Sequence, residues 1–262
     1  MSRPIITLTT DFGHSDHFVG TVKGVILGIL PSAEIVDITH EIAPFAITEA
    51  AFVVAQAYSY FPRRTVHVVV VDPGVGTTRR PILAEAAGQY FVAPDNGVLS
   101  MVFAREEHKA RHVTAAGYFL PQPSNTFHAR DIFAPVAAHL GRGVAPSKFG
   151  RLIRDHQRLD FARPVRTGEG RWSGTVLKVD RFGNVITSFR PGELPELQHK
   201  TFRIVTRTWS VERLVRSYAE GAPGELVVVE GSAGYLEVVS NQASAARNLG
   251  IAAGEPLELV LV

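Results

Sequence analysis

The stretch TVHVVVVDPG, residues 65–74, decides the fold of this chain. Residues 65–71 form a nearly continuous run of β-branched side chains, which is typical of a strand buried on both faces of a parallel sheet. Asp72, Pro73 and Gly74 end this strand, and a Pro-Gly pair fits the centre of a type II turn. An acidic residue that follows such a strand lies at the sheet edge where α/β proteins bind ligands.

Strands and helices alternate on both sides of this stretch in the first half of the chain. Apolar residues recur at helical spacing from Asp16 to Pro31, and from Pro44, taken as a first helical residue, to Pro62. A further helical stretch ends near Gly141. Short β-rich runs lie at 5–9, 34–38, 82–86 and 90–93. This alternation predicts an N-terminal α/β domain with a central, mostly parallel sheet.

The second half of the chain has a different pattern. From residue 172 onward, short β-rich runs are separated by Gly, Pro and charged turns, which predicts a C-terminal antiparallel β-barrel domain. The runs lie at 174–179, 184–189, 202–206, 225–230, 235–239 and 257–262. The polar segment 160–171 is the expected boundary, so we expect domains at 1–165 and 172–262.

The composition is that of a folded protein. The 262 residues are 45% hydrophobic and contain no cysteine, which excludes disulfides and cysteine nucleophiles. The 27 Lys and Arg against 25 Asp and Glu are nearly balanced and dispersed, so neither nucleic acid nor a membrane is an expected partner. No apolar run reaches the ~18 residues of a membrane span, and no signal-type segment opens the chain. We therefore expect a cytoplasmic protein.

Polar residues follow the first predicted strand in the segment TTDFGHSD, residues 9–16. A carboxylate at a strand end accepts both hydroxyls of a ribose, so Asp11 is a candidate binding residue, or it closes a turn. Asp16 is a second candidate binding residue, or it caps the next helix. His14 and His17, with the carboxylate of Asp16 between them, form only a weak metal-binding pattern that lacks a clear third ligand. We therefore expect no metal site.

Two further features could carry chemistry in the N-terminal half. Asp72 and Arg79 lie seven residues apart around a tight turn and can form an ion pair that holds a water molecule. His128 lies in a loop that leads into a helix, although histidines in loops are often only surface residues. The spacing along the sequence does not show that His128 lies near Asp72 and Arg79.

In the second half, the segment DRFGN at 180–184 separates two predicted strands. The Asn184 amide offers a donor and an acceptor that suit the edge of an adenine, and Phe182 could stack on its face. A hairpin turn explains the same residues.

Six motifs occur in order along the chain: TTDFGHSD, VVDPGVGTTRR, APDNG, TFHARDIFAP, DRFGN and GSAGYLEVVSNQASAA. Together they resemble the S-adenosyl-L-methionine (SAM) hydroxide adenosyltransferases, the hydrolase branch of the superfamily that contains the fluorinase and the chlorinase. The resemblance runs from about residue 5 to the C-terminus.

The resemblance implies a homotrimer in which each substrate lies between the N-terminal domain of one subunit and the C-terminal domain of a neighbour. It also implies attack of water or hydroxide on C5′ of SAM, which releases adenosine and L-methionine, with no cofactor.

The resemblance further implies roles for individual residues. Asp72, Arg79 and His128 match a water-activating set. Asp11 and Asp72 match ribose ligands, and Phe45 an aromatic beside the nucleoside. Phe182 and Asn184 match adenine contacts, with backbone groups around Val239 and Asn241. Asp180, Ser232 and Tyr235 match contacts of the methionine moiety, with Glu237 nearby.

Two alternatives to hydrolysis stay open. The first is a chlorinase-like halogenase. The sequence differs from the fluorinases, which carry Tyr at the position of Asp72 and Tyr-Ser at the positions of His128 and Ala129. They also have a long insertion that is missing here between Arg80 and Tyr90. The other alternative is a module that binds adenosine or SAM without turnover. Which of Arg79 and Arg80 acts is not decided by the sequence.

Overall fold

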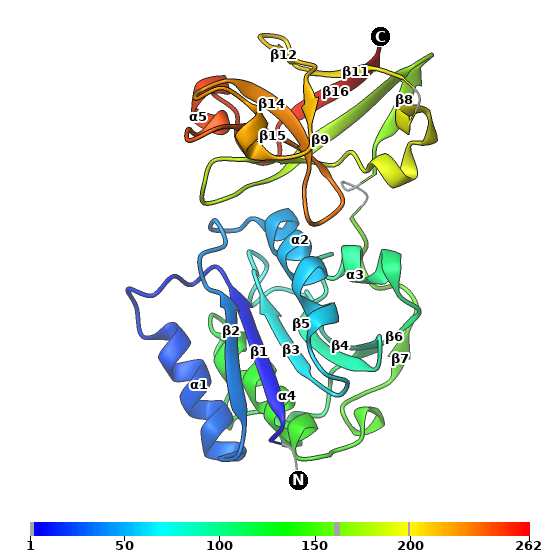
Figure 1. The fold of residues 1–262 in the computed structure, drawn as a ribbon. Coiled ribbons are helices and arrows are strands. Elements are labelled where there is room, and N and C mark those ends of the chain that lie inside the picture. The colour runs from blue at the N-terminus through cyan, green and yellow to red at the C-terminus, as the bar shows by residue number, and fades with distance from the viewer. Residues whose placement is uncertain (1–2, 160–162, 199) are drawn as a thin grey trace. The chain divides into compact units, whose positions relative to one another are not determined.

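The computed structural model describes residues 3–159, 163–198 and 200–262. The chain divides into two compact units, Met1–Leu159 and Asp160–Val262. The boundary expected at 160–171 lies partly outside the described residues. Figure 1 shows the order of the elements.

Unit 1 is built on one mixed sheet with strand order β2-β1-β3-β5-β4-β6-β7. The first four of these strands are parallel, and the last three pair antiparallel. Their bounds are β1 (Ile5–Thr10), β2 (Glu34–Thr39), β3 (Val66–Val70), β4 (Pro81–Ala86), β5 (Gln89–Pro94), β6 (His108–His112) and β7 (Leu152–Ile153). All five residues of β3 are buried, which confirms that it is covered on both faces.

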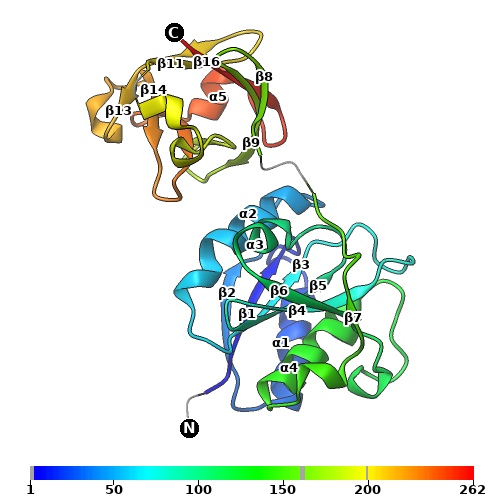
Figure 2. The same cartoon turned by 90° about the vertical axis from the view of Figure 1, so that its right-hand side faces the viewer.

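Helices cover both faces of this sheet, as Figure 2 shows. Helices α1 (Phe18–Ile29) and α4 (Ala134–Gly141) lie on one face, and α2 (Ile47–Ala57) and α3 (Ser100–Arg105) lie on the other. A π-helical turn, Ala129–Phe133, leads directly into α4. None of the helices in the described part of the chain is long and apolar enough to cross a membrane.

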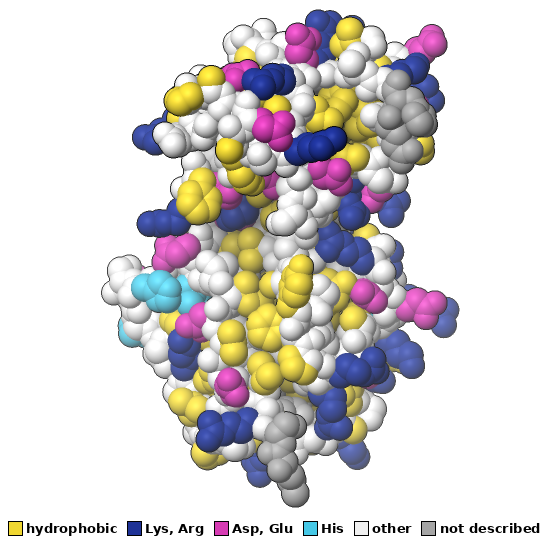
Figure 3. All heavy atoms as spheres, in the orientation of Figure 1, with side chains coloured by type: hydrophobic (Ala, Val, Ile, Leu, Met, Phe, Trp, Pro, Cys, Tyr) yellow, Lys and Arg dark blue, Asp and Glu magenta, His cyan; other side chains and the backbone are white. Residues whose placement is uncertain are grey.

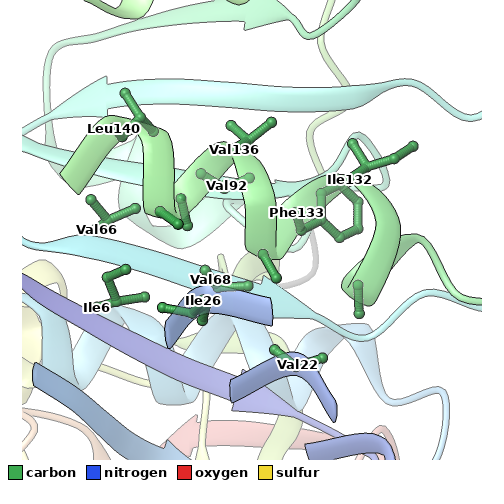
Figure 4. Close-up of a cluster of buried hydrophobic side chains, with 14 of the residues drawn as sticks. Ile6, Val22, Ile26, Val66, Val68, Val92, Ile132, Phe133, Val136 and Leu140 are labelled. Carbon is green, nitrogen blue, oxygen red and sulfur yellow. The ribbon is translucent and has the colours of Figure 1, made fainter. Parts of the chain in front are cut away.

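The core of unit 1 lies between the sheet and the α1–α4 face (Figure 4). Ile6 in β1, Val68 in β3 and Ile26 in α1 are no more than 1% exposed, and Phe133 is fully buried beside them. Each such side chain contributes roughly 1.5–3 kcal/mol when it leaves water. This packing fixes the strand ends on which the polar loops stand.

Unit 2 is a curled sheet with strand order β12-β11-β16-β9-β10-β15-β14-β13, and β8 pairs with β9. Its pairs are antiparallel except β13 with β14. Bounds are β8 (Val165–Gly168), β9 (Arg171–Val179), β10 (Val185–Thr187), β11 (Phe202–Val205), β12 (Ser210–Val211), β13 (Leu214–Val215), β14 (Leu226–Glu230), β15 (Leu236–Ser240), α5 (Ala245–Leu249) and β16 (Pro256–Leu261). The predicted fold class, an α/β domain followed by an antiparallel β-barrel domain, is confirmed, with the barrel present as a curled sheet that forms a half-barrel.

Three local expectations were wrong. Helix α2 begins at Ile47 rather than Pro44, because the backbone of Phe45 is left-handed at φ +68° and interrupts a helix there. Val75 N–H donates to Asp72 O at 3.2 Å, so the turn exists, but Gly74 lacks the positive φ of a type II turn. Asp16 does not cap α1, since His17 holds the N-cap position, and its side chain makes no capping hydrogen bond.

Candidate active site

A pocket of about 270 Å³ lies at the carboxyl ends of β1 and β3 in unit 1. Asp11 and Phe12 reach it from the loop after β1, and Asp72 reaches it from the loop after β3. Because β1 and β3 are adjacent parallel strands, their carboxyl ends share one edge of the sheet. His128, which is far away in the sequence, lines the same pocket.

One guanidinium contacts both Asp72 and His128. Arg79 Nε donates to Asp72 Oδ1 at 3.0 Å, and Arg79 Nη2 donates to Asp72 Oδ2. The same Nη2 group lies 3.1 Å from His128 Nδ1. The side chains of Asp72 and Arg79 are 5% and 7% exposed, so this ion pair is largely withdrawn from water.

Arg80 points to different partners. Its Nη2 donates to Asp95 Oδ2 at 2.6 Å, and its Nη1 donates to both carboxylate oxygens of Asp155 at 3.0 Å. Of the two neighbouring arginines, Arg79 is therefore the one that contacts Asp72.

The charges of this cluster set the protonation states. Burial raises the pKa of Asp72 above its usual range, although the positive charge and hydrogen bonds of Arg79 oppose the shift. Burial and the Arg79 charge lower the pKa of His128. His128 is therefore a neutral imidazole beside the ion pair of Asp72 and Arg79. Because Arg79 donates toward Nδ1, the neutral ring carries its proton on Nε2.

The loop that carries His128 is held by a buried carboxylate. Asp131 Oδ2 accepts Ser124 N–H at 2.8 Å and Ser124 Oγ–H at 2.9 Å, and Arg130 Nε donates to Asp131 Oδ1 at 2.6 Å. These bonds lower the pKa of Asp131 although burial raises it. The π-helical turn that follows is a geometry frequent at functional sites.

The loop after β3 meets the His128 loop at a glycine. Gly76 has φ +78°, and a Cβ built there would lie 2.2 Å from the backbone oxygen of Asn125. Only glycine allows this approach together with this backbone conformation. Gly76 thus permits Arg79 and His128 to reach each other.

Asp11 is tied to an aromatic residue of the pocket wall. Its Oδ2 accepts Phe45 N–H at 2.9 Å, which holds Phe45 in its left-handed conformation. The Phe45 ring is 70% exposed, and it lines the pocket without packing into the core.

A buried histidine beneath the Asp11 loop escaped the sequence analysis. His40 is 1% exposed, and burial lowers its pKa. Its Nε2 lies 3.1 Å from Asp37 Oδ1, and its Nδ1 lies 2.7 Å from Thr10 Oγ1. Thr10 Oγ1 in turn accepts Phe12 N–H at 3.3 Å, so this chain of polar contacts reaches the backbone N–H that follows Asp11, the predicted ribose ligand.

Unit 2 has a pocket of its own, of about 460 Å³, that contains the predicted adenine contacts. Phe182 is 79% exposed at its rim, and Asn184 is 7% exposed within it. Sequence reasoning did not single out five further lining residues, although three of them, Ser240, Gln242 and Ser244, lie within the motif GSAGYLEVVSNQASAA. The five are Tyr218, Ser240, Gln242, Ser244 and Arg247.

The turn at 180–184 is held by Asp180. Its Oδ1 accepts the backbone N–H groups of Phe182 and Asn184, and its Oδ2 accepts Asn184 Nδ2–H, each at 2.9 Å. The hairpin-turn interpretation therefore holds for the backbone, and the bond to Nδ2 also fixes the orientation of the Asn184 amide. Gly183 has φ +86°, and Ser244 Oγ lies 2.1 Å from where its Cβ would stand.

The remaining candidates of unit 2 lie in or near β15. Glu237 and Tyr235 are 6% and 4% exposed, whereas Ser232 is exposed in the preceding turn. Burial and the charge of Asp180 raise the pKa of Glu237. Val239 belongs to a buried apolar cluster, and Asn241 Nδ2 donates to Gly221 O at 2.8 Å.

Asp16 is exposed and does not line the pocket of unit 1. In the described part of the chain, no group of three or more His, Asp or Glu side chains could hold a metal ion.

Comparisons with known proteins agree over nearly the whole chain. Residues 6–150 match the SAM hydroxide adenosyltransferase N-terminal domain, and residues 174–258 match the C-terminal domain. A Salinispora tropica protein named (R)-S-adenosyl-L-methionine hydrolase is 38% identical over 98% of this chain and 97% of its own. A fluorinase of Actinopolyspora mzabensis is 31% identical over 94% of this chain and 93% of its own. The crystal structure of an uncharacterized conserved protein from Thermotoga maritima matches with a TM-score of 0.88 at 39% identity, covering 97% and 99% of the two chains.

Proposed function

The chain belongs to the SAM hydroxide adenosyltransferase family, and we propose that it hydrolyses S-adenosyl-L-methionine to adenosine and L-methionine. The matches confirm the resemblance drawn from the six sequence motifs. The observation that carries the proposal is the contact of one guanidinium, that of Arg79, with both Asp72 and His128 at the wall of a pocket.

The reaction needs one water molecule that is positioned and that loses a proton. The water oxygen attacks C5′, the C5′–S bond breaks, and its electron pair stays on sulfur, so the sulfonium leaves as the neutral thioether of L-methionine. Because a sulfonium is already a good leaving group, the main tasks of the protein are to place the water in line and to accept its proton.

Asp72 is the proton acceptor in this proposal. Its carboxylate is ionised beside Arg79, and burial raises its pKa, which makes it a stronger base than an exposed aspartate. His128 Nε2–H donates to the water, because Nδ1 faces Arg79. Arg79 Nη1 is buried without a hydrogen-bond partner among the described residues, and a bound water supplies one.

The two pockets take different parts of the substrate. Asp11 accepts the ribose hydroxyls, with Phe45 against the nucleoside. In unit 2, Phe182 stacks on the adenine and Asn184 meets its edge, which the exposed ring and the oriented amide of these residues support. The methionine ammonium and carboxylate go to Asp180, Ser232 and Tyr235, near Glu237.

A homotrimer that combines N-terminal residues of one subunit with C-terminal residues of a neighbour completes the proposal. It rests on the resemblance to the family. Light scattering coupled to gel filtration tests it, and a particle with the mass of a single chain would contradict it.

The fluorinase relative raises the question of a halide nucleophile. A buried carboxylate at position 72 repels a halide anion but accepts a proton from water, so the side chain of Asp72 favours hydrolysis. Products made in the presence of chloride and fluoride test this directly, since a halogenase would form a 5′-halogenated adenosine.

Labelled water gives the sharpest test of the reaction. The protein is incubated with SAM and EDTA in H₂¹⁸O, and the products are analysed by liquid chromatography with mass detection. We expect adenosine that carries ¹⁸O at the 5′ position together with unlabelled L-methionine. Intact SAM after hours, with tight binding by calorimetry, would identify a binding module instead. Because the Salinispora relative is named for the (R) form, both sulfonium diastereomers are tested.

A further inference from the structure

A second concave region of unit 1 lies beside β6 and β7, and it shares no residue with the pocket around Asp72. Its volume is about 770 Å³, and residues 104–110, 152–154, 156 and 158 line it. Lys and Arg side chains gather along this side of the unit in Figure 3. We call it the His108–His156 pocket.

Two imidazoles and one guanidinium converge at its centre. His108 Nε2 lies 3.2 Å from His156 Nε2. Arg158 Nη2 lies 3.1 Å from His108 Nε2, and Arg158 Nε lies 3.3 Å from His156 Nε2. His108 is fixed in place, because its ring stacks on Phe103 with the centroids 4.0 Å apart and the planes at 12°.

The protons of this cluster cannot all be satisfied. His108 Nδ1 faces the carbonyl oxygen of Glu106 at 3.0 Å, so Nδ1 carries the proton and Nε2 offers one lone pair. If His156 is protonated at Nε2, this N–H and that of Arg158 Nη2 compete for the lone pair of His108, and Arg158 Nε–H faces an N–H instead of an acceptor. If His156 is protonated at Nδ1, each of the two Nε2 lone pairs accepts one N–H from Arg158, and the Nδ1–H of His156 has no acceptor among the described residues.

His156 Nδ1 adds to this imbalance. It is buried, and it has no hydrogen-bond partner among the described residues. In one tautomer it is therefore a donor without an acceptor, and in the other an acceptor without a donor. A buried polar group without a partner destabilises the folded chain, so a ligand that supplies the missing partner is favoured.

The charges around the cluster favour an anion. Arg105, Lys109, Arg154 and Arg158 line the pocket with four positive charges, against the carboxylates of Glu106 and Glu107. The Glu106 carboxylate accepts Tyr58 O–H at 2.7 Å, so it already has a partner.

We propose that the His108–His156 pocket binds a doubly charged oxyanion, such as sulfate or the phosphate group of a small molecule. Its oxygens accept from the guanidinium of Arg158 and from the N–H groups of the protonated imidazoles, which gives these donors acceptors that the described residues do not supply. Arg suits such a ligand because its N–H groups form a planar fork.

A divalent metal ion is the competing ligand for two imidazole nitrogens. No third His, Asp or Glu side chain in the described part of the chain completes a metal site with them. The positive guanidinium of Arg158 within 3.3 Å of both nitrogens also repels a cation.

Anion binding in this pocket depends on pH. Burial lowers the pKa of His156, and the electrostatic interactions with His108 and Arg158 lower it further. A bound dianion favours the imidazolium, so its affinity rises as the pH falls. Arg80 and Asp95 also act on the ring of His156. The other charged groups near it are Arg105 from α3, Glu106, Glu107 and Lys109 around the start of β6, Arg154 after β7, and Asp155, its neighbour in sequence.

Calorimetry with sodium sulfate tests the proposal, because the charge of sulfate stays constant between pH 6 and pH 8. We expect one site per chain that binds at least threefold more tightly at pH 6. Arg158→Gln weakens it at least tenfold, Arg158→Lys weakens it less, and His156→Gln removes most of the pH dependence. Arg142→Gln, an exposed cation of the same unit outside the pocket, changes nothing.

Two further measurements separate this pocket from the proposed catalytic one. Sulfate binding persists in the presence of saturating adenosine, and Arg158→Gln retains wild-type SAM hydrolysis. The proposal is overturned if sulfate does not bind, if the three pocket variants bind it like the wild type, or if adenosine displaces it. Tight binding of zinc that improves in Arg158→Gln would also overturn it.

Discussion

The Arg79 guanidinium bonds to both oxygens of Asp72, so a change at position 72 can remove the negative charge and leave the shape of the site. We expect Asp72→Asn to lower kcat by roughly 10²–10⁴, the usual contribution of a positioned general base. Binding of adenosine, measured by calorimetry, should change far less. The loss of a ribose contact without loss of turnover would contradict the role of Asp72 as the base.

The pH profile follows from the same residue. An ionised Asp72 accepts the proton, so kcat falls as the pH drops through its pKa, which burial raises above the usual value of aspartate. We expect this acid limb in the wild-type protein and not in Asp72→Asn. Initial rates between pH 4 and pH 9 measure it.

Phe45 combines an exposed ring with a left-handed backbone, at φ +68° and 70% exposure. Phe45→Gly and Phe45→Ala remove the same aromatic wall, so both should raise KM for SAM to a similar extent. They differ in strain, because a left-handed conformation costs a residue with a Cβ roughly 1–2 kcal/mol and glycine nothing. We therefore expect the Gly variant to unfold at higher urea concentration than the Ala variant. Equal stability of the two would mean that the backbone at 45 is free to relax.

At the scale of elements, two loops meet where Gly76 approaches the carbonyl oxygen of Asn125. Gly76→Ala adds both a left-handed strain and a clash, so we expect a loss of about 2 kcal/mol or more in stability and a lower kcat, since His128 must move away from Arg79. Gly143→Ala is the matched control, because Gly143 has φ +95° but open space around it. Chemical denaturation and initial rates distinguish the two, and an active, stable Gly76→Ala would show that the loops do not need this contact.

Elements with strong apolar patterns could be predicted, and short or polar ones could not. Strands β1 and β3 follow from their β-branched runs, whereas β6 has the sequence HKARH and shows no apolar alternation. Strands β7, β12 and β13 have two residues each, and α3 has six, too few for a period to appear.

The contacts of the candidate site likewise fall into those that could be predicted from the sequence and those that could not. Asp72 and Arg79 are near neighbours in sequence, so their ion pair could be predicted from the tight turn between them. His128 is 49 residues from Arg79, and His40 is 30 residues from Thr10. These contacts depend on how the loops and the elements that carry them pack, which no local pattern encodes.

At the scale of the whole molecule, the residues assigned to one substrate stand in two separately folded units. The residues that line the Asp72 pocket all belong to unit 1, and those that line the Phe182 pocket all belong to unit 2. In the proposed reaction the two units therefore take separate tasks, water activation with ribose binding in unit 1 and adenine binding in unit 2. Variants that damage one unit should leave the fold of the other intact.

This separation allows a complementation experiment on the proposed trimer. Asp72→Asn inactivates the N-terminal contribution, and Phe182→Ala, at an exposed ring whose loss does not disturb the core, weakens the C-terminal one. In trimers reassembled from equal amounts of both variants, a site shared between neighbours in a closed ring joins two undamaged halves about one time in four. We expect about a quarter of the wild-type kcat/KM, measured at a SAM concentration far below KM. If each site belongs to a single subunit, the mixture shows only the mean of its two parents, and the shared-site arrangement is wrong.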